Sequence, residues 1–263
     1  MAFIEAAGLS KSFPSPSGVR HVLADVSIAV ERGEFVSIVG FMGCGKSTLL
    51  NLLAGVTVPD SGTLLIDGQP LQGVGKRVSI VFQNYSLLPW FSALENVRLA
   101  VRAAQPEWPR AQQKEQAERY LRLVGLGNAL HRRPGQLSGG MRQRVAIARA
   151  FATDPDLLFL DEPFGALDAL TRASLQQELA GLCSAAGHPV TVIMITNNLD
   201  EALLLSDRII PMTRGPRATL GTPVTVDLKK PRGADQLSHD EEAIRVKDHV
   251  VQCLTDHLHA VAV

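Results

Sequence analysis

The chain has 263 residues, of which 46% are hydrophobic, and its 26 Lys and Arg residues are balanced by 26 Asp and Glu residues. This length suffices for one large domain, or for one domain with an inserted lobe. The neutral balance of charge gives no reason to expect a nucleic-acid partner.

Cysteine content and hydropathy indicate a protein of a reducing compartment. The three cysteines, Cys44, Cys183 and Cys253, are odd in number and lack the spacing of a metal site or a disulfide framework. No apolar run approaches the ~18 residues that a spanning helix requires, and the N-terminal residues do not resemble a secretory signal. We therefore expect a soluble, cytosolic protein that could still dock on a membrane protein.

The first forty residues are expected to form short strands. Turn-forming residues at 15–18 and 31–34 separate them. Residues 35–39 are an apolar strand that runs into a glycine-rich loop, and residues 49–54 are expected to be helical.

An amphipathic helix is predicted over residues 110–124, because apolar side chains recur at i, i+3, i+4 and i+7 from Ala117. Gly125 and Gly127 are expected to end it. Residues 86–137 are therefore predicted to be a mostly helical insertion.

Two further apolar strands are predicted at 157–160 and 190–195, with a helix from Met141 preceding the first of them. Helices that alternate with apolar strands favour a parallel sheet covered on both faces. The pattern weakens over residues 213–235, where Gly and Pro recur, and a final helix is expected at about 240–258.

Residues 40–47 read GFMGCGKS and match the phosphate-loop pattern G-x-x-x-x-G-K-S/T between a strand and a helix. Glycines let backbone N–H groups turn toward phosphate oxygens, and the helix N-terminus adds the positive end of its dipole. Lys46 is expected to supply charge to the β- and γ-phosphates, and Ser47 a hydroxyl to Mg²⁺. The residues predicted to bind the nucleotide here are Gly40, Phe41, Met42, Gly43, Cys44, Gly45, Lys46, Ser47 and Thr48.

Two acids, Asp161 and Glu162, follow the apolar run at 157–160. Asp161 can hold Mg²⁺ through water, and Glu162 can polarise the attacking water as a general base. Alone, a strand that ends in two acids also describes any solvated strand end. Beside a phosphate loop, it predicts a catalytic site.

A second anion site is predicted where Ser138, Gly139 and Gly140 precede a helix, since they make a cap and an open helix N-terminus. Two anion sites in one chain make sense if two copies of the domain meet. Each nucleotide would then lie between the phosphate loop of one subunit and the Ser-Gly-Gly helix of the other.

These motifs, in this order, resemble the nucleotide-binding subunits of ATP-binding cassette (ABC) transporters over about residues 3–215. The resemblance implies an α/β P-loop NTPase fold of the ABC cassette type, with a parallel-sheet core, N-terminal antiparallel strands and a helical inserted lobe. It also implies ATP and Mg²⁺ as cofactors. The expected organisation is a single nucleotide-binding domain over 1–263, with a core at about 1–85 and 138–215, a helical insertion at about 86–137 and a C-terminal tail at about 216–263.

The resemblance assigns roles to further residues. Phe13 matches the aromatic residue that stacks on adenine, and Gln83 matches a glutamine that senses Mg²⁺ and contacts the transmembrane partner. Residues 137–141 match the signature sequence, and Asp168 lies in the loop that crosses between the two sites. The metal ligands would be Ser47, Gln83 and Asp161. The alternatives are plain core for Phe13, a surface amide for Gln83 and a helix cap for Asp168.

The run Leu-Leu-Pro-Trp at 87–90 resembles importers for nitrate, nitrite, cyanate, bicarbonate, sulfonates and taurine, and the preceding Asn84-Tyr85 is closer to the nitrate, cyanate and bicarbonate branch. This inference is associational, because the ion never touches this subunit. Leu87, Leu88, Trp90 and Phe91 would receive a short cytoplasmic helix of the membrane subunit. The alternative is that they form core of the inserted lobe.

The last predicted strand ends in Thr196-Asn197-Asn198, and the family has a histidine that touches the γ-phosphate and the attacking water where Asn197 stands. Asparagine is shorter and offers only a neutral donor. Losing one donor to transition-state charge costs roughly 10²–10³ in rate in other enzymes. The catalytic residues would thus be Glu162, Gln83 and Asn197.

Asn197 leaves three outcomes open: slow hydrolysis as a homodimer, work beside a second cassette that has the histidine, or ATP binding without turnover. We favour the second, because the intact signature at 137–141 could complete a partner's site. The alternative is that the family tolerates Asn here with little loss.

The resemblance finally implies a second ATPase subunit, transmembrane permease subunits and, indirectly, a periplasmic substrate-binding protein, at the cytoplasmic face of a bacterial inner membrane. We predict an ATPase that energises import of a small anion, first nitrate or nitrite, with cyanate, bicarbonate, sulfonate or taurine as alternatives. A DNA-repair or translation cassette would carry two cassettes or long coiled-coil arms, and a non-hydrolysing regulatory cassette has only Asn197 in its favour.

Overall fold

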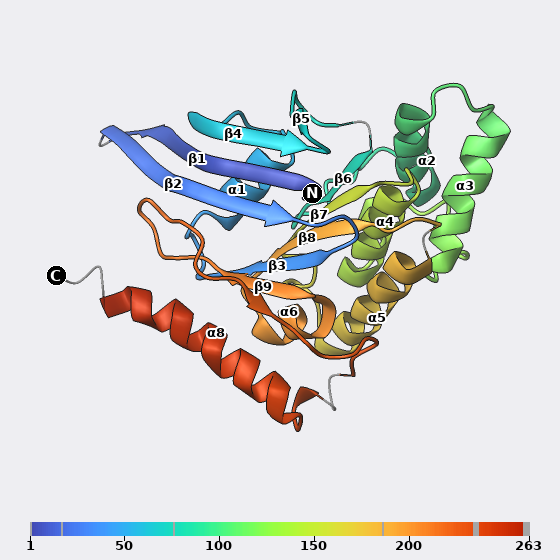
Figure 1. Ribbon diagram of the computed structural model, residues 1–263. Coiled ribbons are helices and arrows are strands. Elements are labelled where there is room, and N and C mark those ends of the chain that lie inside the picture. The colour runs from blue at the N-terminus through green and yellow to red at the C-terminus, as the bar shows by residue number, and fades with distance from the viewer. Residues whose placement is uncertain (1, 17, 76, 186, 234–236, 260–263) are drawn as a thin grey trace. The chain divides into compact units, whose positions relative to one another are not determined.

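The computed structural model describes residues 2–16, 18–75, 77–185, 187–233 and 237–259. The chain forms two compact units, one of Met1–Gly75 with Thr191–Val263 and one of Lys76–Val190. Figure 1 labels their helices and strands. Within the described ranges, no helix is both long and apolar enough to cross a membrane.

An antiparallel sheet opens the first unit. Its strands, in spatial order, are β2 (Gly18–Val30), β1 (Ile4–Ser15), β4 (Ser61–Ile66) and β5 (Gln69–Pro70). The expectation of short strands was wrong, since β1 has 12 residues and β2 has 13. Shifts of register between Ala6 and Ser12 interrupt the alternation of side chains, although backbone pairing continues on both sides of them.

Both turns of this region are confirmed. β1 ends at Ser15 and β2 begins at Gly18, whereas Ser17 lies outside the described residues. In the second turn, the N–H of Glu34 donates to the carbonyl of Glu31 at 3.2 Å, and Gly33 has a φ of 78°.

A parallel group of strands forms the centre of the first unit. It runs in the order β10 (Val224–Thr225), β9 (Arg208–Pro211), β3 (Phe35–Val39) and β8 (Thr191–Thr196), with β10 antiparallel to β9. Every residue of β3 and β8 is buried. Burial on both faces explains why the two strands are nearly continuous apolar runs.

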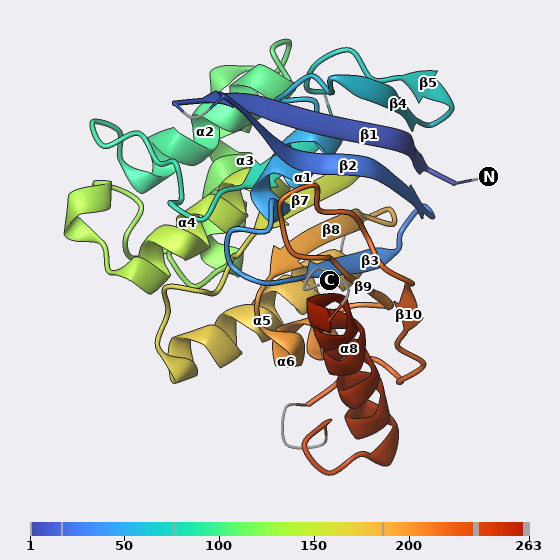
Figure 2. The same cartoon turned by 90° about the vertical axis from the view of Figure 1, so that its left-hand side faces the viewer.

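Helices cover both faces of this parallel group, as Figures 1 and 2 show. On one face lies α1 (Lys46–Leu53), which contacts both β2 and β8, and on the other lie α6 (Leu199–Leu205) and α8 (Glu241–His259). The final helix is confirmed. The predicted helix at 49–54 begins earlier, at Lys46, because the end of the glycine-rich loop is already helical.

A hydrophobic cluster joins the C-terminal segment to the rest of the first unit. Its buried members are Val39, Ala202, Leu203, Ile209, Val226, Val246 and Val250. The tail, which had little pattern in the sequence, is thus part of the core of this unit.

The second unit combines two parallel strands with helices. The strands are β6 (Val78–Val81) and β7 (Leu157–Asp161), and the helices are α2 (Ala93–Ala104), α3 (Arg110–Leu123), the 3-10 turn η1 (Pro134–Gln136), α4 (Gly139–Phe151) and α5 (Ala169–Ala185). The amphipathic helix is confirmed as α3, which buries Ala117 and Leu121. Parallel strands that alternate with helices confirm the α/β class, whereas the proposed division into core, insertion and tail stays a prediction.

Two helices of this unit were not predicted, although the sequence carries their signals. Ser92 and Glu95 form a reciprocal capping box at the start of α2. In α5, the buried Leu175, Leu179 and Leu182 have helical spacing.

Candidate functional site

The loop between β3 and α1 has a backbone that favours glycine at two points. Gly43 and Gly45 have φ angles of 76° and 110°, in the left-handed region. A Cβ atom on Gly45 would lie 2.9 Å from Cγ1 of Val22, and one on Gly40 would lie 3.0 Å from Sγ of Cys44. The glycines therefore let the loop curl tightly against its surroundings.

Lys46 is held at the base of this loop. Its side chain is buried, and Nζ donates to the carbonyl oxygens of Gly40 at 2.9 Å and Phe41 at 3.0 Å. The Phe41 carbonyl also accepts the N–H of Cys44 at 3.3 Å. One carbonyl thus helps to set both the curl of the loop and the position of its only cation. Farther along the loop, Met42 is 82% exposed.

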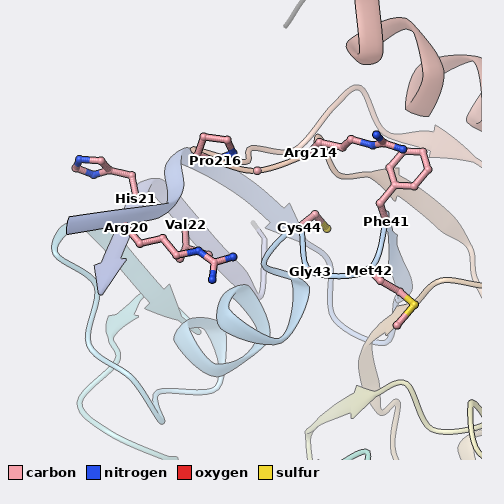
Figure 3. A pocket seen from close by; sticks show the side chains of 10 residues that line it. Arg20, His21, Val22, Phe41, Met42, Gly43, Cys44, Arg214 and Pro216 are labelled. Carbon is pink, nitrogen blue, oxygen red and sulfur yellow. The ribbon is translucent and has the colours of Figure 1, made fainter. Parts of the chain in front are cut away.

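A pocket of about 650 Å³ lies beside the phosphate loop (Figure 3). It is lined by Arg20, His21 and Val22 of β2, by Phe41, Met42, Gly43 and Cys44 of the loop, and by Arg214, Gly215 and Pro216. Two of these residues are arginines and none is acidic, so the pocket suits an anionic ligand. Neither Ser47, exposed in the first turn of α1, nor the half-buried Thr48 is among the lining residues.

Phe13 lies next to this pocket along the sheet, although it is not one of the lining residues. It pairs with Arg20 across β1 and β2. Its side chain is 39% exposed, and Nζ of Lys11 lies 5.6 Å from the ring centroid. Phe13 is therefore not a core residue, and its ring is accessible to a ligand.

The predicted acids lie in the second unit. Asp161 is the buried last residue of β7, and Glu162 follows it with a φ of 43°, which is unusual for a residue with a side chain. The Nε2 atom of Gln83 donates to Oε2 of Glu162 at 3.2 Å. Within this unit, Asp161 and Gln83 offer a carboxylate and an amide oxygen, which are donor types that Mg²⁺ prefers. The residues present thus fit that ion chemically.

Arg149 of α4 holds the segment after Gln83, and sequence reasoning did not find it. Its guanidinium donates to the carbonyls of Tyr85 at 2.9 Å and Ser86 at 2.6 Å. Both of those residues have left-handed backbone, with φ angles of 66° and 45°. Burial lowers the pKa of Arg149 from its usual value. No local sequence signal indicates this contact, because the two segments are 63 and 64 positions apart.

Trp90 extends from the same segment. It is 63% exposed, whereas Leu87, Leu88 and Phe91 are half-buried. The Trp90 and Phe91 rings meet edge to face with centroids 6.4 Å apart. Trp90 is therefore not core of the lobe, and an apolar partner could cover it.

The Ser-Gly-Gly turn has a local role. Ser138 caps α4 by accepting the N–H of Met141 at 3.3 Å. A Cβ atom on Gly140 would lie 2.5 Å from Cγ2 of Thr171, so glycine is needed where α4 meets the start of α5. Gly139 is less crowded, since the nearest atom to its Cβ position would be the Tyr85 hydroxyl at 3.6 Å.

Asp168 caps the next helix, α5, which was the alternative to a role in the loop between two nucleotide sites. Its Oδ1 atom accepts the N–H of Thr171 at 3.0 Å. This backbone hydrogen bond lowers the pKa of Asp168 from its ordinary value. The role of Asp168 between two nucleotide sites stays a prediction.

The two adjacent asparagines after β8 do different things. Asn198 caps α6, because its Oδ1 atom accepts the N–H groups of Asp200 at 2.9 Å and Glu201 at 3.4 Å. Asn197 is exposed, and none of the described residues makes a hydrogen bond with its side chain. Asn198 is therefore structural, whereas the Asn197 amide is not committed to a hydrogen bond with any of the described residues.

Three comparisons with known proteins identify the family of the chain. The profile of the ABC transporter family matches residues 23–165. The chain is 48% identical to the nitrate import ATP-binding protein NrtD of Synechococcus elongatus, over 94% of this chain and 89% of that one. It is 43% identical to the bicarbonate transport ATP-binding protein CmpD of Synechocystis, over 96% of this chain and 89% of that one.

Among solved structures, the dimeric ATP-binding cassette MJ0796 bound to ADP and Pi superposes with a TM-score of 0.76 at 29% identity. The match covers 86% of this chain and all of that one. The family profile, the relatives and the solved structure all indicate an ABC-type ATP-binding cassette. The chain therefore belongs to the ABC transporter family, as an ATP-binding cassette that hydrolyses ATP.

Proposed function

We propose that this cassette drives the import of a small anion, with nitrate or nitrite as the first candidate. The observation that carries this proposal is the 48% identity to a nitrate import ATP-binding protein over 94% of the chain. Bicarbonate is the second candidate, because a bicarbonate transport ATP-binding protein is 43% identical over 96% of the chain. Anion specificity, in this proposal, resides in the permease and in the periplasmic binding protein.

The phosphate loop binds the triphosphate in this proposal. Backbone N–H groups from Gly43 to Thr48 receive phosphate oxygens, and Lys46 exchanges its two carbonyl partners for the β- and γ-phosphates. The exposed ring of Phe13 receives adenine. Three observations support this assignment: the left-handed φ angles of Gly43 and Gly45, the burial of Lys46, and a pocket that has no acidic lining residue.

Hydrolysis requires a base and a cation. Glu162 takes the proton of the attacking water, and Gln83 orients its carboxylate through the hydrogen bond at 3.2 Å. Ser47, Asp161 and Gln83 would hold Mg²⁺, which neutralises phosphate charge when bound.

A second cassette completes the nucleotide site. Ser138, Gly139 and Gly140 of one subunit cover the nucleotide of the other, and Asp168 lies between the two sites. Because Asn197 offers only a neutral donor, we propose a heterodimer in which the other subunit supplies a histidine at this position. The pair attaches to permease subunits at the cytoplasmic face of a bacterial inner membrane, where Trp90 and its neighbours receive a short permease helix.

The experiment is reconstitution of the cassette in proteoliposomes, together with the permease that co-purifies with it and a periplasmic binding protein. Both ATPase activity and uptake into the proteoliposomes are measured for each candidate anion or substrate: nitrate, nitrite, cyanate, bicarbonate, a sulfonate and taurine. Glu162→Gln is the control without turnover. Stimulation by nitrate or nitrite supports the proposal, and stimulation by bicarbonate alone moves it to the second candidate. Activity that no anion stimulates contradicts both.

A further inference from the structure

We propose that Arg214 is a positioning residue for the phosphate loop and acts through the ring of Phe41. The Cζ atom of Arg214 lies 3.9 Å from the centroid of the Phe41 ring, and Figure 3 shows the two side chains together at one end of the pocket. A flat guanidinium at this distance from an aromatic face is a stacked cation–π contact. The proposal rests on the nucleotide binding at this loop described above.

Arg214 projects from a short loop that is anchored at both ends. The N–H of Met212 donates to the Val39 carbonyl at 2.7 Å, where β3 enters the phosphate loop. Thr213 and Thr219 close the loop with hydrogen bonds of 2.9 and 2.8 Å. Arg214 therefore extends from a fixed base rather than from a free surface loop.

The same segment is also fastened to the strand that lines the pocket. The N–H groups of Arg217 and Ala218 donate to the carbonyls of His21 at 3.2 Å and Val22 at 2.9 Å. A Cβ atom on Gly215 would lie 3.9 Å from the carbonyl oxygen of Cys44. The segment from Met212 to Ala218 thus forms one wall of the pocket and contacts the phosphate loop.

The position of Phe41 matters for binding because its carbonyl is shared. That oxygen accepts both Nζ of Lys46 at 3.0 Å and the N–H of Cys44 at 3.3 Å. Fixing the Phe41 ring therefore fixes the backbone that sets the start of the loop and the position of Lys46. Arg214 also places a permanent positive charge on a pocket that holds a polyphosphate.

The first test is ATP binding by the purified cassette, measured by calorimetry, together with steady-state hydrolysis. Arg214→Ala is expected to weaken ATP binding and raise KM about two- to fivefold, with kcat changed less than twofold, since an exposed cation–π contact is weak. Arg214→Lys keeps the positive charge but loses the flat stacked group, so its ATP affinity and KM should lie between those of wild type and of Arg214→Ala. Phe41→Tyr keeps the ring, so in that background Arg214→Ala should still weaken ATP binding.

The second test is a double-mutant cycle of Arg214→Ala with Phe41→Leu. If Arg214 acts through the ring, the double variant should bind ATP no more weakly than the worse single variant. Additive losses would mean that Arg214 acts by charge alone and would overturn the proposal, as would single variants that bind like wild type.

A matched control separates positioning from stability. In the same unit, the Cζ atom of Arg32 lies 4.0 Å from the centroid of the Phe3 ring. This pair lies just beyond one end of the β1–β2 pairing, whereas Phe13 and Arg20 lie near the other end. Arg32→Ala should change the melting temperature at most, and leave KM as in wild type. The proposed nucleotide site has its own test: wild-type protein should bind ATP, and Lys46→Ala should abolish that binding. If wild-type protein fails to bind ATP, the result counts against the nucleotide site itself rather than against the role of Arg214.

Discussion

The amide of Gln83 donates to the carboxylate of Glu162 at 3.2 Å, although the two residues are 79 positions apart in the sequence. Gln83 follows the carboxyl end of β6, and Glu162 follows the carboxyl end of β7. These two strands are parallel neighbours. Carboxyl ends of parallel neighbours meet at one edge of a sheet. A carboxylate and an amide that can orient it are thereby brought together within one compact unit.

Replacing Gln83 tests whether this contact orients the base. Gln83→Met keeps the size of the side chain and removes both the donor to Glu162 and the oxygen offered to Mg²⁺, so kcat should fall about tenfold, whereas ATP affinity measured without Mg²⁺ should stay unchanged. Glu162→Gln should lower kcat further, by about 10²–10⁴, because the general base is lost. Phosphate-release assays and calorimetry measure the two quantities. Asn84→Ala is the neighbouring control, and a Gln83→Met enzyme with wild-type kcat would contradict the assigned role.

Restoring the family histidine tests whether Asn197 limits hydrolysis. In the purified cassette, Asn197→His should raise kcat about tenfold or more, because a charged donor can stabilise the developing negative charge. Single-turnover hydrolysis shows whether the chemical step itself has changed. An unchanged rate would remove the argument for a handicapped site, and with it the main reason to expect a heterodimer.

The neighbouring asparagine should affect stability instead. Asn198→Ala removes the cap of α6, which costs about 1 kcal/mol and lowers the melting temperature by about 2–4 °C. Asn197→Ala, at an exposed position, should leave the melting temperature unchanged. Calorimetric unfolding of the two variants compares the amides directly, and equal shifts would mean that the cap is not what distinguishes them.

Arg232 should be a large contributor to the stability of the C-terminal segment. Its guanidinium donates to four backbone carbonyls, those of Leu203, Ser206, Val226 and Leu228. Arg232→Ala leaves these half-buried acceptors without their donor and should cost about 2–4 kcal/mol. Arg245→Ala, which breaks a surface pair with Glu242, should cost less than about 1 kcal/mol. Equal melting temperatures for the two variants would refute this.

The cap of α5 predicts a dependence of stability on pH. The hydrogen bond from the Thr171 N–H lowers the pKa of Asp168 below its ordinary value of 3.8. The ionised carboxylate therefore stabilises the fold above pH 3.8, and this contribution is lost as the pH falls through the lowered pKa of the folded state. The difference in melting temperature between wild type and Asp168→Ala should be present at pH 5 and shrink below pH 3.8. A difference that does not depend on pH would assign the effect to something other than the charge.

Features confined to one stretch of chain could be predicted from the sequence. The phosphate loop around Lys46 needs only a strand, glycines and a helix in succession, and the buried strands β3, β7 and β8 are legible as apolar runs. The Ser138 cap likewise depends on residues three positions apart. In each case the deciding interactions are local, so the order of residues contains them.

Other features were decided by tertiary structure, because their partners come from distant segments. Irregular register hid the length of β1 and β2, since a shift of pairing changes which side chains alternate without ending the strand. Arg149 donates to the turn after Gln83, and Arg214 stacks on Phe41, only because folding brings segments that are distant in sequence into contact. The sequence by itself determined the glycines, lysine and serine of the phosphate-loop pattern and their order between a strand and a helix. The fold decided which side chains hold those residues in place, and which of two adjacent asparagines is committed to a helix cap.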